Sequence, residues 1–157
     1  MQFLAILYGP SGSGKTLGCL RAFPDALFIG LPGRLPTGYL GLDNYPIKHI
    51  VPKDVDHIGK LIEQHHKKVP AIVIDDFSLL ADDELAACKA SHRGFTANDV
   101  FNQRVYKLFR GSARAAECPV LVTMHEMAPK IVGEENKKPI PGSPLIKGWQ
   151  LPEKLPA

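Results

Sequence analysis

The segment Gly9-Pro10-Ser11-Gly12-Ser13-Gly14-Lys15-Thr16 decides the fold of this chain. It fits the pattern G-x-x-x-x-G-K-[ST] of a phosphate-binding loop, which requires a strand before it and a helix after it. Residues 3–8 form a short apolar run of the buried-strand type, and residues 17–23 can form a short helix that Pro24 ends. The segment therefore predicts a loop that cradles the phosphates of a nucleoside triphosphate.

Each residue type in this loop has a chemical task. Gly9, Gly12 and Gly14 permit positive φ angles and bring backbone N–H groups close to phosphate oxygens. The helix that begins near Lys15 points its positive dipole end at the same anion, and the Lys15 amine would reach the β- and γ-phosphates. The hydroxyl of Thr16 would ligate Mg²⁺. The alternative is a Gly/Ser turn that Lys and Thr follow by chance. The residues expected to contact ATP are Gly9, Pro10, Ser11, Gly12, Ser13, Gly14, Lys15, Thr16 and Leu17.

The composition indicates one ordinary globular domain over residues 1–157, with 45% hydrophobic and 22% charged residues. No run approaches the roughly 18 apolar residues of a membrane span, and the first strand begins too early for a signal peptide. Cys19, Cys88 and Cys118 are odd in number and widely spaced, which favours a reducing compartment over a disulfide framework or a zinc site. The net charge of +3 permits a nucleic-acid partner without requiring one. We therefore expect a cytoplasmic protein that does not associate with membranes.

Apolar runs of strand length alternate with helical patterns along the chain. This alternation predicts an α/β fold with a mainly parallel sheet. Thr96 or Asn98 is expected to cap the longest helix, and Asp54 is expected to cap an earlier one. The predicted strands after the first are 26–29, 47–51, 71–75 and 120–124, the further helices are 55–67, 79–91 and 98–117, the long loops are 30–46 and 126–144, and 145–157 can hold one more short strand.

The segment Ile72-Val73-Ile74-Asp75-Asp76, together with Ala71 before it, has the Walker B arrangement of four apolar residues and then an acid at a strand end. Its first carboxylate is expected near Thr16, where Asp75 would hold the Mg²⁺ shell, usually through water. The alternative is that Asp75 and Asp76 only cap the turn that follows.

Polar residues also end the next predicted strand, at Thr123 and His125. In P-loop ATPases of the additional-strand type, this strand lies between the loop strand and the Walker B strand, so its end faces the γ-phosphate. Thr123 and His125 have donor groups suited to sensing that phosphate. The alternative is that His125 is a surface residue at a strand end.

The order of these motifs resembles that of the RecA-like ATPases. The resemblance is closest to small phage-encoded nucleotide-binding proteins implicated in single-strand annealing and recombination. It rests on residues 9–16, 72–76 and 120–125 and on the tail segment 140–148, Ile-Pro-Gly-Ser-Pro-Leu-Ile-Lys-Gly. It implies a three-layer P-loop NTPase core of the RecA-like (additional-strand) type, the cofactors ATP and Mg²⁺, single-stranded DNA as partner, and self-assembly into a homo-oligomer. A single-strand-binding protein is a further partner that the resemblance suggests, and loop 126–144 matches the second DNA-binding loop by position.

Two departures from the RecA-like pattern affect the expected chemistry. RecA-like enzymes usually place a catalytic glutamate at the end of the second strand, but residues 29–34 contain no acid. Asp76 is the best substitute as the hydrolytic base, and Glu126 is the second. If both are silent, the chain hydrolyses ATP slowly or only binds under nucleotide control. The sequence also stops at Ala157, where such domains usually continue into another strand, so a final strand could be lacking.

The helix predicted over residues 98–117 has an apolar side and a basic side. The basic side could contact DNA phosphates or offer an arginine to the nucleotide of a neighbouring subunit, or it is simply a solvated face. No acidic residue is interleaved with it. Arg93 and Lys147 are further candidates for acting on a neighbour's nucleotide. The apolar residues are Phe101, Val105, Leu108, Phe109 and Ala116, and the basic ones are Arg104, Lys107, Arg110 and Arg114.

The expected function is that of a Mg²⁺-dependent ATPase acting on single-stranded DNA. Its catalytic residues would be Lys15, Asp76 and His125, and its metal ligands Thr16 and Asp75. Two rivals remain. A small-molecule kinase of the nucleotide type opens with the same loop but needs a lid with paired arginines, which Arg104, Arg110 and Arg114 mimic only loosely. A non-hydrolysing ATP switch needs no catalytic base at all.

Overall fold

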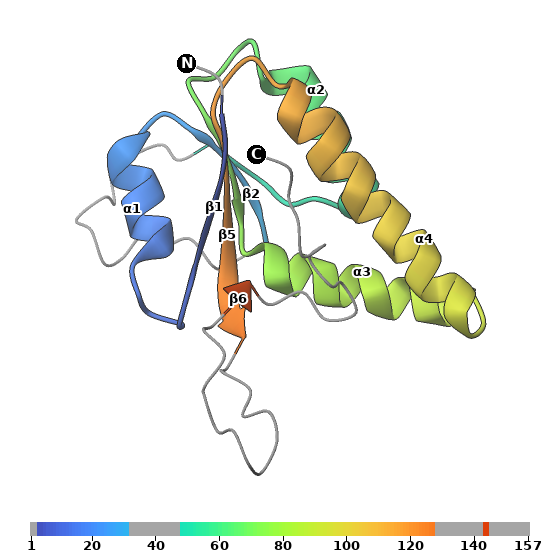
Figure 1. Ribbon diagram of the computed structural model, residues 1–157. Coiled ribbons are helices and arrows are strands. Elements are labelled where there is room, and N and C mark those ends of the chain that lie inside the picture. The colour runs from blue at the N-terminus through green and yellow to red at the C-terminus, as the bar shows by residue number, and fades with distance from the viewer. Residues whose placement is uncertain (1–2, 32–47, 128–142, 145–157) are drawn as a thin grey trace.

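The computed structural model describes residues 3–31, 48–127 and 143–144 of the chain (Figure 1). The predicted loop interiors 32–46 and 128–142, the strand expected within 145–157 and Lys147 lie outside these residues.

Five parallel strands form one sheet within the described residues, and the fold is α/β as predicted. The strand order is β1-β5-β4-β2-β3, and a short β6 pairs antiparallel with β5. β5 therefore lies between the loop strand β1 and the acidic strand β4, which confirms the predicted placement of that strand. The strands are β1 (Leu4–Gly9), β2 (Leu27–Gly30), β3 (Lys48–Ile50), β4 (Ile72–Asp75), β5 (Val120–Met127) and β6 (Ser143–Pro144).

Helices cover both faces of this sheet (Figure 1). Side chains alternate along each strand, so Phe28 and Val73 pack with α1 on one face, while Ile29 and Ile74 pack with the other helices on the opposite face. The arrangement is compatible with a three-layer α/β fold. The helices are α1 (Lys15–Ala22), α2 (Val55–His65), α3 (Phe77–Ser91) and α4 (Phe95–Tyr106), and α4 continues into the π-helix η2 (Lys107–Ala113).

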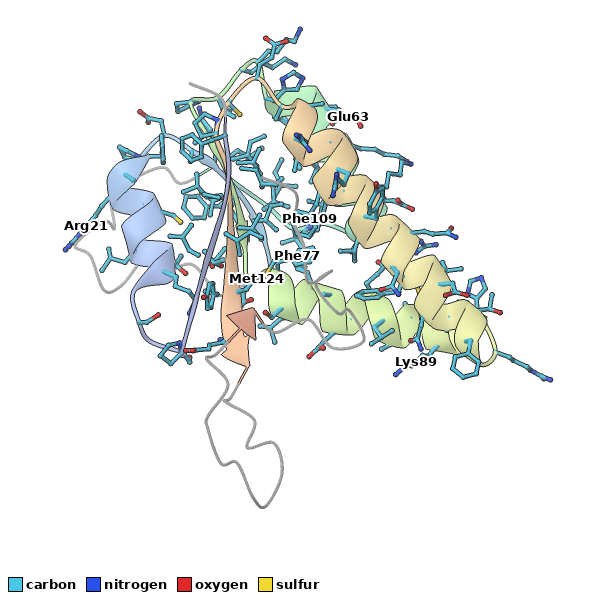
Figure 2. The ribbon with its side chains drawn as sticks, in the orientation of Figure 1. Arg21, Glu63, Phe77, Lys89, Phe109 and Met124 are labelled. Atoms are coloured by element: carbon cyan, nitrogen blue, oxygen red, sulfur yellow. The ribbon has the colours of Figure 1, made fainter. Side chains whose placement is uncertain are left out.

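The larger of the two cores lies between the sheet and α2, α3, α4 and η2. Phe77 and Phe109 meet there edge to face, with ring centroids 5.0 Å apart, and Met124 of β5 is buried beside them (Figure 2). The whole predicted apolar side of the long helix is buried, which confirms that pattern. This core fixes α3 against the end of β4, where the polar residues gather.

Two helix starts show how local sequence sets the fold. Asp54 caps α2 as predicted, because its carboxylate accepts a hydrogen bond from the His57 N–H at 2.6 Å. α3 begins two residues before the predicted start, since the Asp76 carboxylate caps it by accepting from the Ser78 N–H at 2.9 Å.

The predicted cap of the longest helix was wrong. α4 begins at Phe95 with Gly94 at the cap position, and neither Thr96 nor Asn98 occupies it. Gly94 has a φ of 58° and a ψ of −137°, a conformation that side chains disfavour, so the glycine sets the boundary.

The start of the second long loop was also wrong. Glu126 and Met127 belong to β5, where they pair with Pro144 and Ser143 of β6. The strand extends because a partner from later in the chain supplies the pairing.

Two remaining findings bear on the surroundings of the protein. No helix within residues 3–31, 48–127 and 143–144 is both long and apolar enough to cross a membrane. Cys19, Cys88 and Cys118 are all free thiols and all buried.

Candidate phosphate and metal site

The predicted phosphate loop follows β1 and leads directly into α1. Gly12 and Gly14 have φ angles of 78° and 80°, which confirms the conformation expected of them. Gly9 does not have a positive φ, so that part of the prediction was wrong. A Cβ at Gly9 would lie 3.3 Å from the Ser13 Oγ, so the constraint there is close approach rather than backbone conformation.

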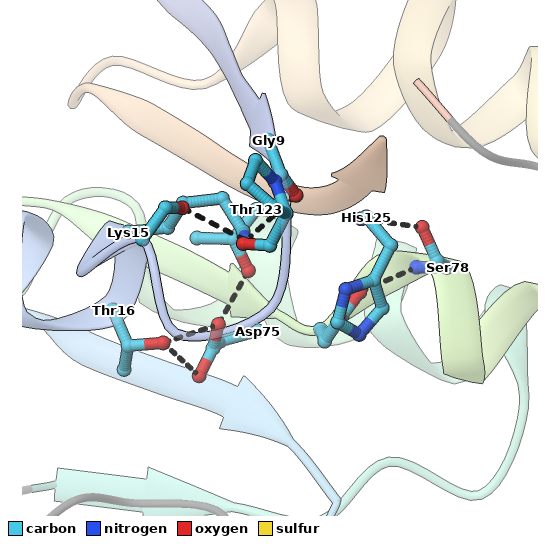
Figure 3. A network of polar contacts seen from close by, with 10 residues as sticks. Gly9, Lys15, Thr16, Asp75, Ser78, Thr123 and His125 are labelled. Carbon is cyan, nitrogen blue, oxygen red and sulfur yellow. Dashed lines mark hydrogen bonds and ion pairs between the residues drawn. The ribbon is translucent and has the colours of Figure 1, made fainter. Parts of the chain in front are cut away.

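The Lys15 amine folds back across its own loop. Its Nζ donates to the carbonyl oxygens of Gly9 at 3.1 Å and Pro10 at 2.9 Å, and to the Ser13 Oγ at 3.4 Å (Figure 3). These acceptors hold the cation at the mouth of the loop, next to where the backbone N–H groups of the α1 terminus would meet an anion.

Thr16 and Asp75 come together across 59 residues of sequence. The Thr16 Oγ1 donates to both Asp75 carboxylate oxygens, at 2.9 and 3.0 Å, and the buried Thr123 hydroxyl donates to the Asp75 Oδ1 (Figure 3). The three residues come from α1, β4 and β5, because the carboxyl ends of neighbouring parallel strands share one edge of the sheet.

Asp76 forms a ring of polar contacts with Ser78 and His125, beside the contacts between Thr16, Asp75 and Thr123. Its Oδ1 caps α3 through the Ser78 N–H, and its Oδ2 lies 2.6 Å from the His125 Nε2. The Ser78 Oγ accepts from the His125 backbone N–H at 3.0 Å and completes the ring (Figure 3). The sequence did not point to Ser78, because a serine in a helix start has no motif that distinguishes it.

The surroundings of Asp76 raise the pKa of its carboxyl. Burial raises the pKa of the Asp76 carboxyl above its ordinary value, and the negative charge of Asp75 acts in the same direction. The Ser78 N–H, His125 and Lys15 oppose this shift without reversing it.

Gly30 ends β2 at the place where RecA-like enzymes carry an acid. A Cβ at Gly30 would lie only 1.8 Å from the Asp75 carbonyl oxygen, so no side chain fits there. The missing acid is therefore a consequence of how closely β2 approaches the end of β4.

The donors at the end of β4 suit a magnesium ion. The Thr16 hydroxyl and the Asp75 carboxylate are hard oxygen ligands, and Mg²⁺ is usually held by one or two carboxylates plus substrate phosphates. Within the described residues no three His, Cys, Asp or Glu side chains form a cage for a metal. A magnesium site here would thus take its remaining ligands from phosphate and water.

Cys19 lies one helical turn beyond Thr16 and is fully buried. Burial raises the pKa of the Cys19 thiol to about 11, and the charge of Asp75 adds to the shift. No motif in the sequence predicts that this thiol lies near the acidic strand.

Arg104 differs from the other cations of the predicted basic side. It makes an ion pair with the buried Glu84 of α3, and its Nε lies 3.6 Å from the Asp56 Oδ2 of α2. Glu84 also accepts from the Val55 N–H at 3.0 Å. No acid is interleaved with the basic residues along this helix, as the sequence indicated, but Arg104 finds its acidic partners on neighbouring helices.

The other candidate residues, Glu126 and Arg93, lie apart from the contacts around Asp75 and Asp76. Glu126 is half-buried near the end of β5, and Arg93 is exposed in the turn before α4. Among the described residues, neither makes a polar contact with Asp75 or Asp76.

Comparison with known proteins gives no relative. The chain matched none of the protein-family models against which it was scanned, and a search of curated proteins returned no similar sequence.

Proposed function

We propose that the chain is a RecA-like P-loop ATPase that binds ATP with Mg²⁺ and acts on single-stranded DNA as a homo-oligomer in phage-type recombination or annealing. The observation that carries the proposal is the Thr16–Asp75 contact at 2.9–3.0 Å. It joins the last residue of a phosphate-loop motif to the acid of a Walker B motif, and both are oxygen donors of the kind that Mg²⁺ requires. The strand order supports the additional-strand type, since β5 lies between β1 and β4.

The loop residues would bind the triphosphate, with the N–H groups of residues 11–17 and the α1 dipole facing the phosphates. Lys15 would leave its loop acceptors for the β- and γ-phosphates, because the negative charge of a phosphate adds a Coulomb attraction that the neutral loop oxygens lack. When bound, Mg²⁺ would neutralise charge that develops on the phosphates. Thr16 and Asp75 would hold it, and Thr123 orients the Asp75 carboxylate.

Asp76 is the proposed base for the attacking water, and His125 the proposed sensor of the γ-phosphate. The raised pKa makes the Asp76 carboxylate a stronger base than an exposed one. His125 lies two residues after Thr123 on β5 and pairs with Asp76. The residues around Asp75 and those around Asp76 are therefore both linked to the strand that leads into Glu126. Through that strand the nucleotide state would reach the loop after β5, which is the proposed DNA-binding loop.

The nucleotide proposal is tested by calorimetric titration with ATP in magnesium buffer and in EDTA. Wild type is expected to bind ATP more tightly with Mg²⁺, and Thr16→Val and Asp75→Asn are expected to lose this difference while keeping some Mg²⁺-independent binding. Thr96→Val and Asp83→Asn remove the same groups from exposed helical positions and serve as matched controls. A folded wild type that gives no heat with ATP would disprove the proposal.

The DNA proposal is tested separately by filter binding of labelled single-stranded DNA with and without ATP and Mg²⁺. Retention that rises with ATP is the expected result. Negligible retention in both conditions would disprove the DNA proposal and would not affect the nucleotide proposal.

A non-hydrolysing ATP switch is the second candidate function. It is favoured by Gly30, where no acid fits, and by Asp76, whose two carboxylate oxygens are both engaged. Turnover with and without single-stranded DNA distinguishes the two, because a switch binds ATP without releasing phosphate. The kinase alternative loses support, since Arg104, one of its lid candidates, is held by Glu84.

A further inference from the structure

An aromatic ring and three cations lie together on the outer surface of α4 and η2. Tyr106, Arg110 and Arg114 follow one another at intervals of four residues, so they lie on neighbouring turns of the same helix face. Lys107 flanks them, and all three cations are exposed. We call Tyr106, Lys107, Arg110 and Arg114 the α4 cation patch.

The ring and one of its cations are already arranged as a platform. The Arg110 guanidinium lies over the Tyr106 ring, 5.6 Å from its centroid, while the tyrosine remains 60% exposed. Most of the Tyr106 residue thus stays open to solvent although Arg110 lies over its ring. A flat guanidinium and a flat ring on an open surface are the groups on which nucleic-acid bases stack.

The charges of the patch are not neutralised within residues 3–31, 48–127 and 143–144. The nearby acids have other partners, since Glu63 accepts from the Ser112 hydroxyl at 2.8 Å and Glu117 pairs with Lys67 at 2.8 Å. Arg104, one turn before the patch on the same helix, differs from the patch cations because its charge is paired with Glu84. The patch cations are thus available for an anionic partner.

We propose that the α4 cation patch is a binding site for single-stranded nucleic acid, separate from the nucleotide site and from the loop after β5. A base stacks on Tyr106 and Arg110, and Lys107, Arg110 and Arg114 contact the backbone phosphates. The patch covers about nine residues of helix, at most about 12 Å, which is enough for two or three phosphates. The inference rests on the DNA part of the proposed function, and it adds where a strand is held when no ATP is present.

The test is fluorescence anisotropy of labelled oligothymidylate without nucleotide, over about 50 to 200 mM salt. Arg110→Gln/Arg114→Gln is compared with Arg21→Gln/Lys48→Gln, which removes the same charge from exposed positions on α1 and β3. Each lost phosphate contact lowers the slope of log K against log salt by about 0.7 for a single strand. The patch variant is expected to lose about 1.4 of slope and about 25-fold in affinity near 0.1 M salt, and the control variant to lose far less.

The stacking part has its own variant. Tyr106→Leu is expected to weaken binding by about fivefold or more while leaving the salt slope unchanged, because it removes a ring but no charge. ATP binding by all variants, measured by calorimetry, is expected to match wild type and confirms that they fold.

Four outcomes would overturn the inference. Equal losses in the patch and control variants show only a general charge effect. Competition by polyglutamate as strong as that by oligothymidylate of equal charge shows a site for acidic polymers, including proteins, rather than for nucleic acid. A wild type that binds ATP but no single-stranded DNA would disprove both the patch site and the DNA part of the proposed function. Single-stranded DNA binding that survives in the patch variant would disprove the patch site alone.

Discussion

The Gly30→Ala substitution tests the close approach of β2 to the end of β4, where we propose that Mg²⁺ binds. The added Cβ would lie 1.8 Å from the Asp75 carbonyl oxygen, whereas contacts under 3.0 Å are essentially never seen, so the backbone must separate by about 1.2 Å. The obstacle is a main-chain oxygen rather than the end of a flexible side chain, so a change of rotamer cannot relieve the clash. Gly30 is in register with Asp75, and the movement therefore displaces the carboxylate that Thr16 and Thr123 hold.

Overpacking of this kind costs about 1–3 kcal/mol and sometimes more, and a clash between two main chains belongs at the upper end. About 3 kcal/mol corresponds to a melting temperature lower by about 6–12 °C in a chain of this size. Thermal unfolding followed by circular dichroism measures this change. At a temperature where the variant is folded, calorimetry with ATP is expected to show that Mg²⁺ no longer tightens binding.

Gly18→Ala is the matched control. Gly18 lies in α1, and a Cβ there meets nothing within 4 Å, so the same added methyl is expected to raise stability by up to about 1 kcal/mol through helix propensity. If Gly30→Ala unfolds at the wild-type temperature and keeps Mg²⁺-dependent ATP binding, the argument for a closed β2–β4 edge is refuted.

Three further predictions concern other buried groups. Glu84→Ala leaves the Arg104 guanidinium without its buried partner and is expected to cost about 3 kcal/mol in urea unfolding; a loss below 0.5 kcal/mol would contradict the buried network. Asp76→Asn keeps an oxygen that can cap α3 but loses the ion pair with His125, so ATP binding should persist while phosphate release stops; turnover at the wild-type rate would exclude Asp76 as base. The pKa of Cys19 is raised to about 11 from 9.0, so the unfolded chain loses this proton first as pH rises, and stability is lost between about pH 9 and 11. Unfolding in urea across that range should show a smaller loss for Cys19→Ala, and equal losses would contradict the shift.

The parts of the fold that the sequence predicts are those that short-range patterns control. The phosphate loop has its own motif, and Asp54 caps α2 through its own side chain. The meeting of Thr16 and Asp75 also follows from sequence, because the ends of parallel strands share an edge once the strands are identified.

The parts that the sequence does not predict depend on pairing between distant segments. Glu84 and Arg104 lie on different helices, so the spacing of charges along one helix could not show that they meet. Gly94 sets the start of α4 through its backbone conformation, which leaves no periodic pattern in the sequence. Glu126 joins β5 only because Pro144 returns to pair with it.

The three bonds that Lys15 makes to its own loop have a consequence for ligand selection. A ligand that draws the Lys15 amine away must replace its contacts to Gly9, Pro10 and Ser13, so it gains only the difference between its own interaction and those three. Under the proposed function a phosphate would supply this difference, because its negative charge adds a Coulomb attraction that the three neutral oxygens lack. The three contacts would therefore lower the affinity for any ligand that draws Lys15 away without such a charge.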